Sequence, residues 1–254
     1  MKTLVIANQK GGIGKTTTAT NIASILENKG NHTLLIDADM QGNSSDTYNA
    51  KIEGAATLFD VLLDDERIPL NEAVQQTECG DIVSSDPLLR RADEILRTDT
   101  EGLYRLQDAL KELKGYDYVV IDTAPAINSI LHNALIAADD VIIPVTADRY
   151  ALQGLSQLKE TIEAIKRRQN QNLKIDGLLL VRFNARTRLA QEVQEDLKTI
   201  AKSMNTKVFD ATIRESTKAK EAQAMKKTLI EYAPESTTAQ DYIAVVDELL
   251  KQGV

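Results

Sequence analysis

Short apolar runs of strand length alternate with longer segments of helical period along most of the chain. Several of these runs are continuous rather than alternating, which is typical of strands covered on both faces of a sheet. The predicted strands are residues 4–7, 33–36, 81–83, 118–121, 141–145 and 177–181, with a further candidate at 206–209. The predicted helices include residues 16–29, 102–113, 152–168 and 189–204. This alternation predicts an α/β fold with a twisted, mainly parallel sheet and helices on both faces.

Residues 43–100 are the least regular part of the pattern, and we expect short helices and loops there, at the rim of the sheet. A length of 254 residues suits one large domain, so we expect residues 1–254 to form a single domain. No apolar run approaches the roughly 18 residues that a membrane-spanning helix needs. The lone cysteine, Cys79, cannot form an internal disulfide. These features favour a cytoplasmic protein.

Charge is distributed unevenly along the chain. The net charge is −8, which by itself argues against a polyanionic partner. However, residues 1–150 hold 13 Lys and Arg against 24 Asp and Glu, whereas residues 159–227 hold 16 against 9. Such asymmetry indicates an anion-binding face on an otherwise acidic protein. A solvated surface of mixed charge remains the alternative at this point.

The sequence KGGIGKTT, residues 10–17, follows a predicted strand and opens a predicted helix, which is the context of a phosphate-binding loop. Its glycines let backbone N–H groups converge on phosphate oxygens, and the helix N-terminus adds a partial positive charge. Lys15 would bridge the β- and γ-phosphates, and the Thr16 hydroxyl would bind Mg²⁺. The residues expected to contact the nucleotide are Lys10, Gly11, Gly12, Ile13, Gly14, Lys15, Thr16 and Thr17.

The loop departs from the usual spacing because Gln9 replaces its first glycine and Lys10 adds a second lysine. A lysine is too strongly hydrated to be buried without a partner. Three possibilities follow for Lys10: contact with solvent, with the nucleotide of its own chain, or with the nucleotide of another molecule.

Two aspartate segments follow later strands. The sequence LLIDADMQGNSS, residues 34–45, places Asp37 and Asp39 on the same side of an extended chain, at the end of a strand where α/β proteins hold metal and water ligands. In YDYVVIDTAPAIN, residues 116–128, an apolar strand ends in Asp122, the Walker B pattern of a metal-binding carboxylate. Thr16, Asp37 and Asp122 are therefore the metal-site candidates. Helix capping or a turn role is the alternative for the first pair.

The segment KGGIGKTTT resembles the deviant Walker A motif of the ParA/MinD group of P-loop ATPases. The two aspartate segments resemble the switch and Walker B motifs of that group, and the similarity continues over nearly the whole chain. The resemblance implies a P-loop NTPase fold with ATP and Mg²⁺ as cofactors. Met40 and Ala124 stand where the group commonly has proline, which removes no functional group.

Residue roles follow from the resemblance. In this group the extra lysine crosses a dimer interface to the phosphates of the partner, and the matching residue here is Lys10. Lys15 and Asp39 complete the catalytic set, with Asp39 positioning or activating the attacking water. Asp37 is expected to support Mg²⁺ or the switch. For adenine, Arg182 and Arg214 are the candidates, with surface arginines of no such role as the alternative.

The match favours the short ParA proteins of chromosome and plasmid partition. It implies a weak ATPase whose ATP-bound homodimer binds double-stranded DNA nonspecifically in the cytoplasm, at the nucleoid. A ParB-like centromere-binding partner would stimulate hydrolysis and release the DNA. We expect no N-terminal helix-turn-helix arm. The expected DNA contacts are Arg186, Arg188, Lys218, Lys220, Lys226 and Lys227.

The nearest alternative is a MinD-like regulator that binds membranes through its C-terminal helix. An apolar stripe formed by Tyr242, Ile243, Val246, Leu249 and Leu250 fits such a helix. Its polar positions are mainly acidic, however, and anionic lipid would repel them. We therefore expect this helix to pack on the sheet and expect no membrane partner. A ligase or reductase ATPase with the same loop, and an adaptor that does not hydrolyse ATP, are further alternatives.

Overall fold

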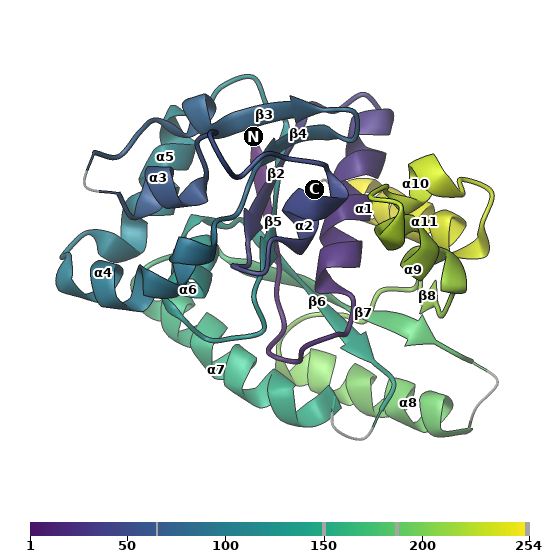
Figure 1. Ribbon diagram of the computed structural model, residues 1–254. Coiled ribbons are helices and arrows are strands. Elements are labelled where there is room, and N and C mark those ends of the chain that lie inside the picture. Colours follow the sequence, from purple (N-terminus) through teal and green to yellow (C-terminus); the bar gives the residue numbers. More distant parts are fainter. Residues whose placement is uncertain (65, 149–150, 186–187, 252–254) are drawn as a thin grey trace.

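A computed structural model describes residues 1–64, 66–148, 151–185 and 188–251 of the chain. Its centre is an eight-stranded sheet in the order β3-β4-β2-β5-β1-β6-β7-β8 (Figure 1). Neighbouring strands are parallel except β3 and β4, which form an antiparallel pair. The strands are β1 (Lys2–Ile6), β2 (Thr33–Ala38), β3 (Val74–Thr77), β4 (Gly80–Val83), β5 (Tyr118–Thr123), β6 (Asp140–Thr146), β7 (Lys174–Phe183) and β8 (Ile213–Arg214). The predicted α/β fold with a mainly parallel sheet is confirmed.

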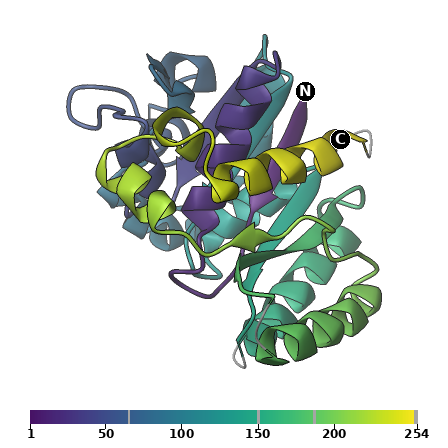
Figure 2. The ribbon, with the colours of Figure 1, turned by 90° about the vertical axis from the view of Figure 1, so that its right-hand side faces the viewer.

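Helices cover both faces of this sheet (Figures 1 and 2). One face carries α3 (Leu58–Leu62), α4 (Ala92–Thr98), α5 (Arg105–Glu112), α6 (Ser129–Ala137), α7 (Ala151–Arg168) and α8 (Arg188–Ser203). The other carries α1 (Lys15–Asn28), α9 (Thr217–Ala224), α10 (Leu229–Tyr232) and α11 (Thr237–Lys251). The short helix α2 (Asn43–Thr47) follows β2, and 3₁₀ turns occupy Leu70–Ala73, Pro87–Arg91 and Gly102–Tyr104.

Alternate residues of each central strand enter opposite cores. In β1, Leu4 and Ile6 pack with α1 and α11, whereas Val5 packs with the helices of the other face. All three side chains are completely buried. This two-sided burial explains why the central strands are continuous apolar runs rather than alternating ones.

Two strand predictions need correction. The edge strand β3 was not predicted, because its sequence VQQT is mostly polar, as an edge strand exposed to solvent allows. The candidate strand at 206–209 forms only an isolated bridge, between Leu178 and Val208, and the eighth strand is Ile213–Arg214 instead. Phe209 nevertheless packs tightly on β7, since a Cβ at Gly177 would lie 2.6 Å from its ring.

The C-terminal helix α11 packs against α1 and β8, on the face of the sheet that Figure 2 shows. Tyr242, Val246 and Leu249 of the predicted stripe are buried, together with Val245, while Ile243 and Leu250 are partly buried. Packing of this helix onto the body of the fold is thus confirmed. No helix in the described ranges has the length and apolar character that crossing a membrane requires.

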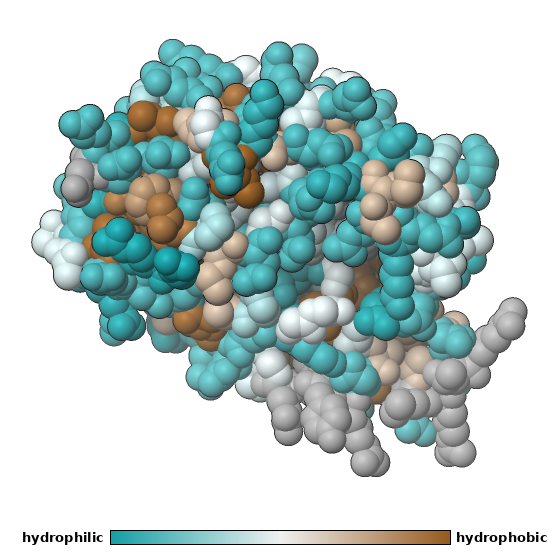
Figure 3. Space-filling view, in the orientation of Figure 1, coloured by the Kyte–Doolittle hydropathy of each residue, from teal (hydrophilic) through white to brown (hydrophobic). Residues whose placement is uncertain are grey.

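The face that contains the carboxyl ends of several strands is mainly hydrophilic (Figure 3). A few large apolar side chains are nevertheless exposed. Among them are Met40, after β2, Leu88, in the 3₁₀ turn after β4, and Ile127, after β5, with exposed fractions of 44%, 37% and 39%. All three follow strands on the edge of the sheet where the phosphate-binding loop lies.

Candidate nucleotide-binding site

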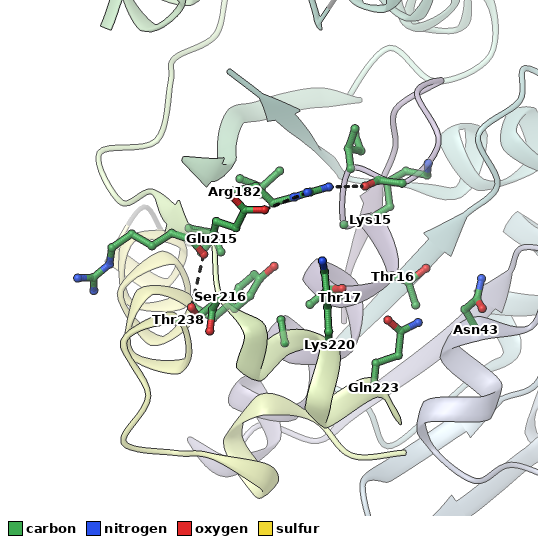
Figure 4. Close-up of a pocket in the computed structure, with 18 of the residues that line it drawn as sticks. Lys15, Thr16, Thr17, Asn43, Arg182, Glu215, Ser216, Lys220, Gln223 and Thr238 are labelled. Carbon is green, nitrogen blue, oxygen red and sulfur yellow. Dashed lines mark hydrogen bonds and ion pairs between the residues drawn. The ribbon is translucent and has the colours of Figure 1, made fainter. Parts of the chain in front are cut away.

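A cavity of about 370 Å³ opens at the carboxyl edge of the sheet, beside the glycine loop (Figure 4). One wall is the loop itself, residues 12–17, and a second is the segment after β2, with Asp39, Gln41 and Asn43. The opposite walls come from the ends of β7 and β8, from α9 and from α11. Ligands of open α/β sheets bind at this edge, so the cavity lies where a nucleotide is expected.

The loop is shaped to bind an anion. Gly12 and Gly14 have φ angles of 70° and 93°, in the left-handed region that favours glycine, and a Cβ on either would meet only open space. Asn8 fixes the start of the loop, because its side-chain amide donates to the Pro144 carbonyl (2.7 Å) and its Oδ1 accepts from Lys10 N (3.0 Å). Helix α1 begins at Lys15, and no side chain in the described ranges caps it. Its first N–H groups therefore remain available for phosphate oxygens.

Lys15 is buried at the end of the loop, only 6% exposed. Its Nζ donates to the carbonyl of Lys10 (3.1 Å). Burial lowers the pKa of Lys15, and the nearby carboxylates of Asp122 and Asp39 partly oppose that shift. A buried ammonium that lines a cavity gains most when an anion enters.

Lys10 does not line this cavity. Its Nζ forms an ion pair with Asp148 and donates to Thr146 Oγ1 (3.3 Å), at the end of β6. The groove around it, of about 320 Å³, also contains Arg182 and Glu215. The two lysines of the loop therefore point into different spaces. Of the three possibilities for Lys10, contact with the nucleotide of its own chain has no support in this arrangement.

Two buried carboxylates lie side by side beneath the loop. Asp37 and Asp122 are partners in the register of β2 and β5, and both have no exposed surface. Burial is the main cause that raises the pKa of Asp122 to about 6 and that of Asp37 to about 7, and Asp122 adds to the second shift. Two carboxylates so close together favour either a proton or a cation.

The contacts of these carboxylates separate their roles. Asp122 Oδ2 accepts from Ser44 Oγ (2.8 Å), while its buried Oδ1 has no hydrogen-bond partner in the described part of the chain. That free carboxylate oxygen and the nearby Thr16 hydroxyl, which acts to lower the Asp122 pKa, are the hard oxygen donors that Mg²⁺ prefers. The residues therefore fit a magnesium ion.

Both oxygens of Asp37 are already engaged. Oδ2 accepts from the N–H and hydroxyl of Ser45, each at 2.7 Å, and Oδ1 accepts from Asp39 N (3.2 Å). These contacts tie the segment after β2 to the end of that strand. Of its two expected roles, they favour support of the switch segment over direct metal binding.

Asp39 lines the cavity and is 6% exposed. Its Oδ1 accepts from Gln41 N (3.0 Å), and its backbone carbonyl accepts from Ser85 Oγ (2.5 Å). Ser85 in turn donates its N–H to Ser45 Oγ (2.9 Å). The serines thus form a small network that positions Asp39 at the cavity wall. Sequence reasoning did not identify Ser44, Ser45 or Ser85, since nothing in their spacing marks them.

Matches to known proteins agree with this site. Residues 1–175 match the family model of an AAA domain. The chain is 37% identical to the chromosome partitioning protein ParA of Myxococcus xanthus, covering 98% of this chain and 88% of the relative. It is 35% identical to the sporulation initiation inhibitor protein Soj of Bacillus subtilis, covering 99% of each. The chain belongs to the ParA/Soj family of partition ATPases. The family inferred from the loop is thereby confirmed.

A solved structure of cobyrinic acid a,c-diamide synthase from Mycobacterium smegmatis, with bound ADP and magnesium, is also similar to the chain. The TM-score is 0.85 at 28% sequence identity, and the match covers 99% of this chain and 95% of that one. The P-loop fold expected from the ParA/MinD resemblance is confirmed. The bound ADP and magnesium of that neighbour support nucleotide and Mg²⁺ binding among these ATPases.

The two arginines proposed for adenine, Arg182 and Arg214, both line the cavity beside the glycine loop, but each has a carboxylate partner. Arg182, at a φ of 53°, donates to Glu215 (3.0 Å), as Figure 4 shows, and to the Gly12 carbonyl (3.4 Å). Arg214 forms a two-pronged pair with Asp241 of α11, with Nε to Oδ2 at 2.9 Å and Nη2 to Oδ1 at 2.5 Å. Their roles in nucleotide binding stay predictions.

The described residues predicted to contact DNA have different surroundings in the structure. Lys218 pairs with Glu221 (2.7 Å) and lies over the Tyr232 ring, and Lys226 pairs with Asp46 (2.7 Å). Lys227 lines a small pocket beside Thr16, and Lys220 lines the nucleotide cavity itself. Arg186 lies outside the described residues, and Arg188 is the first residue of α8. The DNA contacts stay predictions.

Proposed function

We propose that this chain is a DNA-partition ATPase whose ATP-bound homodimer binds DNA nonspecifically and is released by hydrolysis. The observation that carries the proposal is the orientation of the two loop lysines. Lys15 is buried against the cavity, whereas Lys10 lies outside it, in a half-exposed ion pair with Asp148. A lysine in that place reaches a phosphate most simply when a second molecule presents one.

Loops at the same edge of the sheet as Lys10 support a face-to-face dimer. Met40, Leu88 and Ile127 are exposed on neighbouring loops of the same edge, and Ser85 connects the first two loops through the Asp39 carbonyl. If a second copy covered these exposed apolar side chains, they would contribute to an interaction surface. Their burial between two copies would bring each Lys10 toward the cavity of the other.

Hydrolysis would transfer the γ-phosphoryl group of ATP to water and yield ADP and phosphate. The N–H groups of the loop and Lys15 would hold the phosphates, and Asp39 would orient the water and accept its proton. Mg²⁺, held by Thr16 and Asp122, would neutralise charge on the β- and γ-phosphates when bound. Lys10 of the second copy would add positive charge as the bond to the leaving oxygen breaks.

The partner and the DNA binding proposed here are those that the family resemblance implies. The proposal includes nonspecific contact with DNA phosphates and stimulation of a slow ATPase by a ParB-like protein, with the protein at the nucleoid in the cytoplasm. Identities of 35–37% to partition proteins over nearly the full chain favour this function over that of the 28% identical cobyrinic acid a,c-diamide synthase.

A MinD-like membrane function has less support. The apolar residues of α11 are buried, and its acidic residues are engaged: Asp241 with Arg214, Asp247 with Lys29 (2.7 Å), and Glu248 with Lys207. Membrane binding through this helix would require α11 to detach from α1 and from the sheet. Liposome sedimentation that depended on residues 237–251 would favour this alternative.

The test is DNA co-sedimentation with ATP, with ADP, and with a Lys10→Ala variant. We expect the wild-type protein to bind DNA when ATP is present. Replacing ATP by ADP, or wild type by the variant, should weaken DNA binding at least about tenfold, because only a dimer joins two basic surfaces. The variant should still bind ATP with nearly wild-type affinity. DNA binding that ignored both nucleotide and mutation would contradict the proposal.

A further inference from the structure

Helix α9 presents one face to the nucleotide cavity. Its N-cap Ser216 and residues Ala219, Lys220 and Gln223 all line the cavity (Figure 4). Their spacing of three, four and seven residues is that of a single helical face. Lys218 lies on another face, where it contacts Glu221 and Tyr232. The two lysines of this helix, although two positions apart, therefore have different surroundings.

Lys220 differs from the arginines of the cavity, because no carboxylate among the described residues pairs with it. Arg182 is paired with Glu215, and Arg214 is paired with Asp241. In the part of the chain that the structure describes, Lys220 makes neither a hydrogen bond nor an ion pair with another residue. Its charge is thus available to a ligand without the cost of breaking an internal pair.

Lys220 lines the same cavity as the end of the phosphate-binding loop. The wall across from α9 is formed by Lys15, Thr16 and Thr17, at the start of α1. In Figure 4 the Lys220 side chain extends from α9 into the cavity that it shares with Lys15, Thr16 and Thr17. The backbone at the end of such a loop holds the α- and β-phosphates. A cation on the facing wall would contact the same phosphates from the other side.

We propose that Lys220 binds the α- and β-phosphates of the nucleotide, and that it does not belong to the DNA-binding surface. The proposal rests on the nucleotide binding proposed above and adds a second, helix-borne cation to the loop. Because the α- and β-phosphates are present in both ADP and ATP, Lys220 would strengthen the binding of both. It would contribute nothing to adenosine.

The experiment measures ADP affinity by calorimetry for the wild-type protein, Lys220→Ala, Lys220→Arg and Lys111→Ala. Lys111 is an exposed lysine of α5 that pairs with Asp108, so its replacement removes the same charge far from the cavity. We expect Lys220→Ala to weaken ADP binding about five- to tenfold at low salt, since an exposed ion pair is screened by solvent. Lys220→Arg should restore most of the affinity, and adenosine affinity should not change.

DNA binding at saturating ATP gives the second readout. We expect Lys220→Ala to keep the wild-type dependence of DNA affinity on salt, since a lost phosphate contact would lower that slope by about one. Unchanged ADP affinity together with a lower salt slope would instead assign Lys220 to DNA. Unchanged values in both assays would make Lys220 a solvated lysine, and either result overturns the proposal. If the wild-type protein bound no ADP, the proposed function would fail first.

Discussion

The two ends of the nucleotide cavity hold their charges in opposite ways. At the phosphate end, Lys15, Asp39 and Asp122 are buried and fixed by backbone and serine contacts. At the other end, Arg182 and Arg214 are about half exposed and each is neutralised by a carboxylate of the same chain. The first end holds buried charges that internal contacts satisfy only in part, whereas each arginine of the second end already has a carboxylate partner. Affinity should therefore come mainly from the polyphosphate.

At the phosphate end we expect the largest effect from Lys15→Met, which keeps the apolar stem and removes the charge. We expect ATP affinity and turnover to fall by more than about 100-fold, because in the proposed function the buried ammonium would be the main cation at the phosphates. Since burial disfavours the charged form of Lys15, the melting temperature of the ligand-free variant should be unchanged or higher. Nucleotide titration and thermal unfolding measure the two effects.

The control is that ATP affinity should fall while the melting temperature of the ligand-free variant should not. A variant that lost both ATP binding and stability would show that Lys15 holds the fold together. A variant that kept its ATP affinity would contradict the prediction that the phosphate end dominates binding.

Asp122→Asn tests the carboxylate side of the same end. Asn keeps an acceptor for Ser44 but removes the charge beside Asp37, so we expect turnover to fall about 100-fold and the Mg²⁺ concentration for half-maximal rate to rise. The ligand-free variant should be more stable than the wild type by about 1 kcal/mol at neutral pH. Steady-state kinetics over a Mg²⁺ series and urea unfolding in chelator provide the measurements.

The pH dependence of stability adds a check on Asp122. Burial raises its pKa from 3.8 to about 6, so the folded state keeps a proton there that the unfolded state releases. Without Mg²⁺, the wild-type free energy of unfolding should therefore fall as pH rises through this window. Asp122→Asn should flatten that fall. An equal pH dependence in both proteins would mean that Asp122 stays ionised when folded.

The phosphate end was largely predictable from the sequence, and the other end was not. A phosphate loop is made of neighbouring residues, so KGGIGKTT and its context predict the loop, and strand ends predict where Asp39 and Asp122 lie. The partners that decide how these groups behave are distant in sequence. Lys10 and Asp148 are 138 positions apart, and Ser85 reaches Asp39 across 46.

Helix α9 shows the same limit of prediction from sequence within a single helix. The charge count along the sequence places Lys218 and Lys220 in the same basic segment, because it does not show where each side chain points. Only the packing of α9 against the cavity separates a lysine paired with Glu221 from one that lines the nucleotide site. Likewise, the mostly polar strand β3 is defined by its pairing with β4 rather than by its own pattern.

We expect the smallest effect at the other end of the cavity, where the arginines already have carboxylate partners. Glu215→Gln removes the carboxylate that neutralises Arg182, and the side chains are 58% and 49% exposed. We expect ADP affinity to rise about two- to threefold at low salt, because the freed guanidinium adds positive charge to the cavity mouth while solvent screens most of it. Glu195→Gln, which breaks a similar exposed pair with Lys198 in α8, should leave ADP affinity unchanged. Calorimetry at two salt concentrations measures both variants. A weaker ADP affinity in Glu215→Gln would mean that the carboxylate itself contacts the nucleoside, and the second end of the cavity would then recognise its ligand through an acid rather than through Arg182.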